Sequence, residues 1–598
     1  MSILEGLYNG RNIKQLNIKE LSTLCNELRE KIIETVSVNG GHLSSNLGSV
    51  ELTVALHYVF DNPSDKFIFD VGHQSYAHKI LSGRYNEFST IRKEDGLSGF
   101  PNPEESLSDA FIAGHAGTSI SAGLGYCRSR DVLNEDYYVV SVVGDASLFN
   151  GENLEAITSS TIKPRKFLII LNDNGMSISK NNNGLYKTIS KLTIRKNYNK
   201  FNSFMARIFG NSAFGRFLRR IKNSIKRGLS RNTIFDSVGL KYVGKFDGHN
   251  LKTLIRLLSD IKNFSQPTLL HLQTIKGKGL DEAEKDSSRF HGVSKDMKIS
   301  KHYFSSGVSQ ILSRQIQKYP QIQAITAGMK DGVGLAEFAN NYPNSFIDVG
   351  IQEEFAVTLA GGMAKGGTKP IVFMYSTFMQ RAYDQILHDV SIQNLPVVFC
   401  VDRAGFVGND GVTHQGLFDL SYLSHIPNLT ILAPTDLCEF EKMLDFALSK
   451  NTPFVIRYPN GIVKEQNYAK NTDNLLSYDI LTPIDKNVIL AVGPRMLNLA
   501  SEVKNSTDKS VSIINARCIK PLDTEVLDRI CDKNVIILEE NVKTGGFSSA
   551  VINYFVDNGV KTKVNVFAVE DKFIPHASVE RQLTLCGFTV ENIKSKLI

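Results

Sequence analysis

The sequence predicts an α/β fold built from three successive doubly wound α/β domains. Short apolar runs rich in β-branched residues, such as Tyr138–Val143 and Phe167–Leu171, alternate with stretches of helical periodicity and end in Gly, Asp, Asn or His. Such runs are typical of parallel strands that helices cover on both faces. The length of 598 residues also fits three or four domains of about 150–200 residues each.

The composition is that of an ordinary globular protein, with 42% hydrophobic and 22% charged residues. The net charge of +7 is small for this length, so it does not indicate nucleic-acid binding, although it fits an anionic substrate or cofactor. The seven cysteines are scattered and form no CxxC pair, which predicts reduced thiols in a cytoplasmic protein. Neither a signal-peptide pattern nor an apolar run of membrane-spanning length is visible, so we expect no membrane association.

The first predicted domain, residues 1–303, opens with two helices, Lys19–Val36 and Val50–Phe60. The turn between them, SVNGGHLSSNLGS, contains His42. A histidine in such a loop is more often solvated than catalytic, so His42 carries no argument by itself.

A predicted strand, Lys66–Val71, follows and ends in Gly72 and His73. A Pro/Gly-rich loop and a strand-like run, Ala110–Ala113, then lead to the small residues of GHAGT, which open an Ala/Gly-rich helix. Small residues before a helix N-terminus leave backbone N–H groups open to an anion. This turn is therefore a weak candidate anion site.

The strands Tyr138–Val143 and Phe167–Leu171 set Asp145 and Asn174 at their carboxyl ends. In open α/β sheets, ligands usually bind at this edge. A carboxylate and a carboxamide oxygen suit Mg²⁺ that is shared with phosphates. Taken alone, the pair is more simply a capping Asp and a loop Asn, but the surrounding sequence favours the metal site.

Two stretches of the first domain lack the α/β pattern. The insert at about 181–232 contains recurring Lys and Arg and no acidic residue. We interpret it first as a solvated excursion, second as a lid over an anionic site, and only third as a membrane or nucleic-acid surface. Residues 281–303 are charged and weak in apolar periodicity, which predicts a linker.

The second predicted domain spans residues 304–470, where strand, turn and helix repeat in SFIDVGIQEEFAVTLAGG, KPIVFMYSTFMQRAYDQ and LPVVFCVDRAGF. The third spans residues 480–598, and its strands come from NVILAVGPRM, SVSIINARCIKPLD, NVIILEENVKTGGFSSAV and VNVFAVEDKFI.

Taken together, these stretches resemble the transketolase-like thiamine-diphosphate enzymes. GDASLFNG followed by LNDNGMS is similar to the family's diphosphate-and-metal motif. The resemblance extends over nearly the whole chain to the branch of 1-deoxy-D-xylulose-5-phosphate synthases, in GHLSSNLGSVELTVALHYVF, DVGHQSYAHKILSGR, YSTFMQRAYDQ, DRAGFVGNDGVTHQGLFDLSYL and RYPNG. It implies two cofactor-binding folds followed by a C-terminal transketolase-like domain.

The resemblance implies a site for thiamine diphosphate and Mg²⁺ between the first two domains. By it, Asp145, Asn174 and the backbone carbonyl of Met176 ligate the metal, and Glu353 bonds the aminopyrimidine ring, against which Phe378 packs. The other implied cofactor-binding residues are His73, Gly114, His115, Ala116, Gly144, Ala146, Lys276 and Arg381.

The resemblance also implies the reaction, in which pyruvate loses CO₂ and condenses with D-glyceraldehyde 3-phosphate. The product, 1-deoxy-D-xylulose 5-phosphate, feeds isoprenoid, thiamine and pyridoxal precursors. The implied catalytic residues beside Glu353 are His42, His73, His414 and Asp410. The implied substrate contacts are Tyr375, Arg381, Arg403, Asp410, His414 and Arg457, of which Arg403 and Arg457 bind the phosphate. A homodimer is implied as well.

The sequence departs from the family's pattern at four places. Ala146 replaces a glycine, Glu354 and Phe355 replace Gln-His, GHAGT replaces GHSST, and Asn250 replaces an aspartate. If position 146 needed a positive φ, its Cβ would cost about 1 kcal/mol or more, so we expect weaker cofactor binding there. Two alternatives remain open, a divergent paralogue that uses another 2-oxoacid and aldehyde pair, and a catalytically lapsed binding protein.

Overall fold

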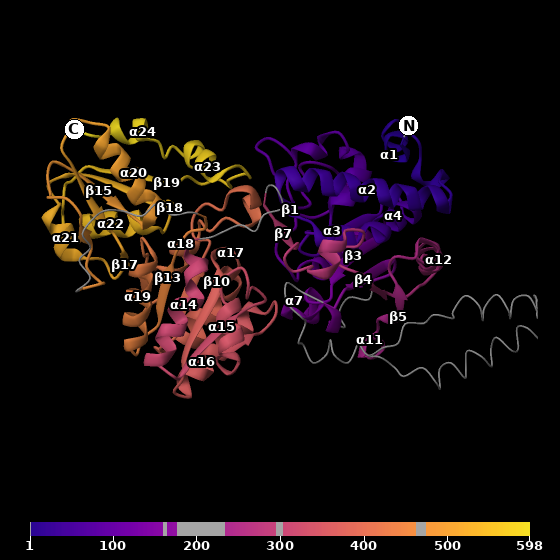
Figure 1. Ribbon diagram of the computed structural model, residues 1–598, viewed down its shortest axis with the longest axis horizontal. Coiled ribbons are helices and arrows are strands. Elements are labelled where there is room, and N and C mark those ends of the chain that lie inside the picture. Colours follow the sequence, from indigo (N-terminus) through magenta and orange to yellow (C-terminus); the bar gives the residue numbers. More distant parts are fainter. Residues whose placement is uncertain (1, 160–163, 176–233, 295–302, 462–473) are drawn as a thin grey trace, which may run out of the picture. The chain divides into compact units, whose positions relative to one another are not determined.

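The computed structural model describes residues 2–159, 164–175, 234–294, 303–461 and 474–598 (Figure 1). The chain divides into two compact units, the first of Met1–Ile91 with Gly99–Lys298 and the second of Arg92–Ser98 with Ile299–Ile598. The basic insert at 181–232 and the predicted metal ligand Met176 lie outside the described residues.

The first unit contains a five-stranded parallel sheet. Its strands, in spatial order, are β2 (Lys66–Phe69), β3 (Val139–Gly144), β4 (Phe167–Asp173), β6 (Thr268–Gln273) and β5 (Lys241–Asp247). Alternate residues of β3 and β4 pack in one core cluster with Ile120 and Leu124 of α6 (Ser119–Val132). The residues between them are also buried, so both faces of the sheet are covered, as the near-continuous apolar runs predict.

The helices α2 (Ile18–Asn39) and α4 (Val50–Val59) match the two helices expected at the start of the chain. Asn17 caps α2, since its side chain accepts hydrogen bonds from two backbone N–H groups of the first turn. The helix ends at Gly40, whose φ of +74° favours glycine.

Two expectations in the first unit are wrong. Ala110–Ala113 forms no strand and lies in the loop that precedes α6. The described part of the expected linker is also structured. It forms α13 (Asp281–Lys285) and then β7 (Gly292–Val293), which pairs with β1 (Gly41–His42).

The second unit contains two sheets. The seven-stranded sheet has the order β17 (Cys518–Lys520), β12 (Thr430–Leu432), β13 (Phe454–Arg457), β11 (Val398–Asp402), β10 (Lys369–Tyr375), β8 (Ile322–Thr326) and β9 (Phe346–Asp348). The five-stranded sheet has the order β14 (Asp479–Ile480), β16 (Val511–Asn515), β15 (Asn487–Ala491), β18 (Asn534–Val542) and β19 (Val564–Val569). All pairings are parallel except those of β17 and β14, so the predicted α/β class is confirmed.

The two sheets of the second unit share one hydrophobic core. Residues of β15 and β16 belong to the same buried cluster as β8, β10 and β11. The stretch SVSIINARCIKPLD is divided between the sheets, because its first half forms β16 while Cys518–Lys520 crosses to pair antiparallel with β12. The limits of the three predicted domains stay a prediction.

The described helices include none that is both long and apolar enough to cross a membrane. All seven cysteines are free thiols, four of them buried, in keeping with the prediction of reduced cysteines.

Candidate active site

Three histidines of the first unit lie together. The ring centroid of His42 is 5.9 Å from that of His73 and 5.6 Å from that of His291, and the last two are 5.4 Å apart. The pairing of β1 with β7 sets His42 opposite Gly292 and so brings His291 beside it. Burial lowers the pKa of His73 to about 3 and that of His291 well below its ordinary value, and the Lys276 cation lowers both further. The His73 and His291 imidazoles are therefore neutral near pH 7.

Asn46 holds the backbone of two of these histidines in place. Its buried side-chain Nδ2 donates to the carbonyl oxygens of His42, at 2.8 Å, and His73, at 2.9 Å. Its Oδ1 accepts a hydrogen bond from the Tyr76 N–H at 2.8 Å. Because one amide group satisfies three backbone groups, it fixes the spacing between the His42 turn and the end of β2.

The carboxyl ends of β3 and β4 carry the two described metal-ligand candidates. Gly144 at the end of β3 lies opposite Asn172 of β4, so Asp145 and Asn174 follow neighbouring strands. Asp145 is 1% exposed, and its carboxylate interacts with the buried Lys276. Burial lowers the pKa of Lys276 to about 8, against the opposing effect of Asp145. No group of three His, Cys, Asp or Glu residues within the described ranges forms a metal cluster, and the predicted metal ligands stay a prediction.

A chain of buried amides beside these strands ends in a donor that has no partner in the part of the chain that the structure describes. Thr274 Oγ1 donates to Asn172 Oδ1 at 2.6 Å, and Asn172 Nδ2 donates to Gln74 Oε1 at 2.8 Å. Gln74 is 3% exposed, and its Nε2 has no hydrogen-bond partner among the described residues. An unsatisfied buried donor costs about 1–3 kcal/mol, so Gln74 Nε2 fits an oxygen acceptor of a ligand. The buried Lys276 cation separately fits an anionic group such as a diphosphate.

Some backbone N–H groups at the helix start in GHAGT already have a hydrogen-bond acceptor within the protein. The Asp70 carboxylate accepts hydrogen bonds from the N–H groups of Gly117, at 3.0 Å, and Ser119, at 3.1 Å. The expectation of open N–H groups is therefore wrong for these two residues. The cofactor contacts of Gly114, His115 and Ala116 stay a prediction.

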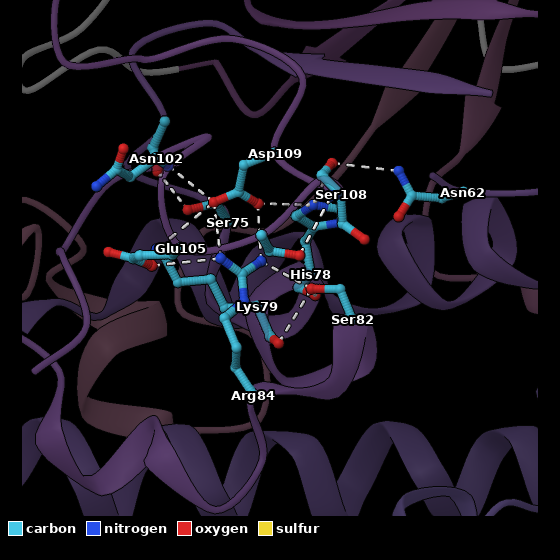
Figure 2. Close-up of polar contacts among 12 residues, drawn as sticks. Asn62, Ser75, His78, Lys79, Ser82, Arg84, Asn102, Glu105, Ser108 and Asp109 are labelled. Carbon is cyan, nitrogen blue, oxygen red and sulfur yellow. Dashed lines mark hydrogen bonds and ion pairs between the residues drawn. The ribbon is translucent and has the colours of Figure 1, made fainter. Parts of the chain in front are cut away.

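A buried charged cluster fixes the helix that follows His73 (Figure 2). The two Asp109 oxygens accept hydrogen bonds from both terminal nitrogens of Arg84, each at 2.7 Å, and His78 Nε2 lies 3.1 Å from Asp109 Oδ1. Lys79 and Arg84 also pair with Glu105. The cluster connects α5 (Tyr76–Lys79) to the loop that precedes GHAGT. Because α5 begins three residues after His73, the cluster also limits the movement of His73.

In the second unit, Glu353 begins α16 (Glu353–Lys365) and is 3% exposed. Burial raises its pKa to about 7, although the guanidinium of Arg381 acts in the opposite direction from 3.4 Å. A carboxyl group with a pKa near 7 both holds and releases a proton at neutral pH. Its burial and its raised pKa make Glu353 a candidate proton carrier.

Four further candidates of the second unit form a continuous row. The Arg403 guanidinium lies 4.1 Å from the Tyr375 ring centroid, and the Tyr375 ring stacks on Phe378 at 5.6 Å. Phe378 in turn meets the His414 ring edge-on at 5.5 Å. Gly332 is needed beside this row, because a Cβ there would lie 2.3 Å from the Tyr375 hydroxyl.

The two arginines predicted to bind phosphate lie at the carboxyl ends of the neighbouring strands β11 and β13 and are paired with carboxylates. Arg403 pairs with Asp402 and donates to the Gly332 carbonyl oxygen at 2.8 Å. Arg457 ends β13 and holds Asp419 through its Nε at 2.8 Å and its Nη2 at 3.1 Å. The pairs orient each guanidinium but use some of its donors, so phosphate binding stays a prediction.

Asp410 has a partner that sequence reasoning missed. Arg92 Nη2 lies 2.9 Å from Asp410 Oδ1, and Arg92 belongs to the short segment Arg92–Ser98 that packs with the second unit. Burial lowers the pKa of His414, while Asp410 raises it and Arg92 lowers it further.

Comparisons with known proteins identify the family to which the chain belongs. The family model described as 1-deoxy-D-xylulose-5-phosphate synthase matches residues 4–274, and models of the transketolase pyrimidine-binding and C-terminal domains match residues 301–466 and 479–593. A Clostridium tetani (strain Massachusetts / E88) protein named 1-deoxy-D-xylulose-5-phosphate synthase is 44% identical over 609 residues, which cover 98% of each chain. The chain belongs to the 1-deoxy-D-xylulose-5-phosphate synthase family. The same name is carried by a Carboxydothermus hydrogenoformans protein that is 43% identical over 99% of this chain and 98% of its own.

As a member of the 1-deoxy-D-xylulose-5-phosphate synthase family, the chain is a transketolase-type transferase. Two of its departures from the family's pattern have a structural explanation. Ala146 has φ −72° and ψ −42°, an ordinary right-handed conformation, so its Cβ causes no backbone strain. Asn250 caps α12 (Leu251–Ile261), accepting a hydrogen bond from the Thr253 N–H as an aspartate would.

Proposed function

We propose that this chain catalyses the condensation of pyruvate with D-glyceraldehyde 3-phosphate, with loss of CO₂, to 1-deoxy-D-xylulose 5-phosphate. The observation that carries the proposal is the 44% identity, over nearly the full length of both chains, to a protein named for this product. The reaction would supply precursors of isoprenoids, thiamine and pyridoxal in the cytoplasm.

Thiamine diphosphate, when bound, supplies the electron sink that decarboxylation requires. In the first unit, Asp145, Asn174 and the Met176 carbonyl are the proposed Mg²⁺ ligands. Lys276 and Gln74 Nε2 would hold diphosphate oxygens, because one is a buried cation and the other a buried donor with no acceptor among the described residues. In the second unit, Glu353 and Phe378 would hold the aminopyrimidine ring.

The side chains of the protein would transfer protons and would position the oxygen atoms and the phosphate of the substrates. Glu353 would carry a proton at a ring nitrogen, a role that its pKa of about 7 supports. The neutral imidazoles of His73 and His291 would donate to, or accept from, substrate oxygens without a fixed charge. His42 and His414 would act in the same way, and Arg403 and Arg457 would orient the substrate phosphate.

The test is product identification from the purified chain. The protein is incubated with thiamine diphosphate, Mg²⁺, pyruvate and D-glyceraldehyde 3-phosphate, and the products are followed by ³¹P NMR and mass spectrometry. We expect a phosphorylated five-carbon ketose and CO₂. If that product is absent while another 2-oxoacid and aldehyde pair turns over, the proposal is wrong and the divergent paralogue is right. If no pair turns over, the chain is a lapsed binding protein.

We propose a homodimer as the working assembly. Several apolar side chains of the first unit are exposed, among them Leu107, Phe111, Ile112, Val132 and Leu133. Exposed apolar surface of this kind supports association with a second copy. Light scattering on the eluted protein measures the mass, and a monomer at micromolar concentration would refute the proposal.

A further inference from the structure

The loop that carries Asp410 and His414 is held by a segment near the C-terminus. We propose that His576 and Gln582 are positioning residues that fix the loop Gly405–Gly416 and the segment Arg92–Ser98 so that Arg92 meets Asp410. This inference rests on the proposed function, since it concerns the same site. The segment Ile574–Gln582, which ends in helix α23 (Val579–Leu585), is called the clamp below.

The Gln582 side chain forms hydrogen bonds with the backbone of the loop. The side chain is fully buried, and its Oε1 accepts from the Gly408 N–H at 3.0 Å while its Nε2 donates to the Gly408 carbonyl oxygen at 3.0 Å. The same Nε2 donates to the Pro575 carbonyl oxygen at 2.7 Å. Gly408 has a φ of +79°, so Gln582 binds the loop at a residue whose conformation favours glycine.

A second glutamine, Gln415, connects the other end of the loop to the clamp by a hydrogen bond. Gln415 Oε1 accepts from the Val407 N–H at 3.1 Å, and its Nε2 donates to the Ile574 carbonyl oxygen at 3.3 Å. The clamp is therefore bonded to the loop before and after Asp410. Two attachment points fix an orientation that one alone would leave free to rotate.

His576 contacts both segments that meet at the ion pair. Its Nε2 donates to the Gly96 carbonyl oxygen at 3.1 Å. Its Cβ packs against Gly411, where an added Cβ would lie only 2.8 Å away. Gly411 directly follows Asp410, and Gly96 lies in the segment of Arg92, so one imidazole side chain sets the spacing between them.

The segment Arg92–Ser98 transmits this position to the guanidinium. The Arg92 N–H donates to the Leu97 carbonyl oxygen at 2.6 Å, and the Gly96 N–H donates to the Lys93 carbonyl oxygen at 2.9 Å. These bonds close the segment into a tight loop, so that holding Gly96 also holds Arg92. Arg92 then reaches Asp410 at 2.9 Å.

A merely structural role would have a different signature. If Gln582 and His576 only stabilised the C-terminal part, their loss would lower stability without changing the loop or turnover by the folded enzyme. If they position the Arg92–Asp410 pair, their loss frees two distant segments at once and lowers turnover while the rest of the protein stays protected. Misplacing a catalytic group by about 1 Å costs up to about 100-fold in rate.

The test compares Gln582→Leu and His576→Ala with wild type, with His576→Gln as a variant that keeps a side-chain N–H donor. Thr584→Ala, at an exposed position on the same helix, is the matched control. Hydrogen exchange by mass spectrometry follows peptides covering 92–98 and 405–416, and steady-state kinetics give kcat and KM for both substrates. We expect faster exchange in these two peptides and a kcat/KM lower by about 10- to 100-fold, with near-normal values for His576→Gln and Thr584→Ala.

Unchanged exchange in both peptides would overturn the inference, and so would a loss of activity that follows a loss of protection across the whole chain. Faster exchange in both peptides with unchanged kinetics would also overturn it. If Gln582→Leu does not fold, His576→Ala decides the question, because this side chain is only half-buried. If wild type makes no 1-deoxy-D-xylulose 5-phosphate, the proposed function fails on its own, and the exchange data still show whether the clamp holds both segments.

Discussion

The two units build their candidate site residues in contrasting ways. The first unit gathers imidazoles, two of which are neutral near pH 7, and holds them with neutral amides such as Asn46. The second unit pairs its charged candidates with opposite charges, as in Glu353 with Arg381, Arg457 with Asp419, and Asp410 with Arg92. The difference teaches that burial favours the neutral form in both units but moves the pKa in opposite directions, lowering that of His73 to about 3 and raising that of Glu353 to about 7.

The largest effect should come from removing the proposed proton carrier Glu353 of the second unit. Glu353→Gln keeps the shape and the burial but cannot ionise. We expect turnover to fall by about 10²- to 10⁴-fold, the usual contribution of a general acid or base. Steady-state assays of product formation measure this, with the secondary structure of the variant checked by circular dichroism. A variant that keeps most of its activity would contradict the assignment of Glu353.

Next in size is the buried cluster behind His73 in the first unit. Asp109→Asn removes a carboxylate that pairs with Arg84, Lys79 and His78 in the interior. Breaking such a buried pair on one side costs about 3–5 kcal/mol of the free energy of unfolding. Burial alone would raise the pKa of Asp109, but Arg84 and His78 lower it in total, so the carboxylate is ionised throughout the neutral range.

The matched control is Asp136→Asn in the same unit. Asp136 pairs with Arg165 and Lys166, but its side chain is 63% exposed. Solvent screens an exposed pair of this kind, so its loss should change stability far less than the loss of Asp109. Urea denaturation of both variants measures the difference, and equal losses of stability would show that the cluster of Figure 2 is not a stabilising core.

The contrast between the units also predicts opposite responses to acid. The folded-state pKa of His73, about 3, lies below its ordinary value of 6.5. The unfolded chain therefore binds more protons between these values, and the first unit loses stability as pH falls from 7 to 5. The folded-state pKa of Glu353, about 7, lies above its ordinary value of 4.5. Here the folded state binds more protons, so the contribution of Glu353 to the stability of the second unit grows over the same change.

Each of these two groups should contribute about 1–2 kcal/mol between pH 7 and pH 5. Glu539, whose pKa burial also raises to about 7, acts in the same direction as Glu353. Hydrogen exchange at both pH values, corrected for its intrinsic pH dependence, reports each unit separately. His73→Gln should remove part of the loss in the first unit, and Glu353→Gln part of the gain in the second. The same sign in both units would contradict the comparison.

What the sequence could predict follows from how local each feature is. The strands, the α/β class and the strand-end positions of Asp145 and Asn174 are visible because apolar runs and turn residues are contiguous in the chain. His291 could not be assigned a role, because its place depends on the pairing of β1 with β7, two-residue strands far apart in sequence. Arg92 lies in a loop without periodicity, and only tertiary packing brings it to Asp410.

Buried polar residues were missed for a related reason. Asn46 stands among serines and glycines in a turn, and nothing in that composition shows that its amide joins two histidine carbonyls. Gln582 and His576 belong to the third sequence segment, whose strands and helices were expected without any role in the site. Backbone conformation is also hidden from sequence analysis, because the replacement of a glycine by another residue does not show the φ at that position.

The hidden backbone conformation matters most at Ala146. Its substitution gives the smallest effect predicted for any of these variants. The weaker cofactor binding expected from its sequence depended on a positive φ, whereas the observed φ is −72°. Ala146→Gly should therefore change the affinity for thiamine diphosphate by less than about twofold. Glycine's extra freedom in the unfolded chain should lower stability by about 0.5–1 kcal/mol. Calorimetric titration with thiamine diphosphate and Mg²⁺ measures the affinity. Binding that is tightened by about tenfold, or 1.4 kcal/mol, would instead mean that the Ala146 Cβ makes an unfavourable contact with the ligand. The φ and ψ of Ala146 do not reveal a contact of that kind.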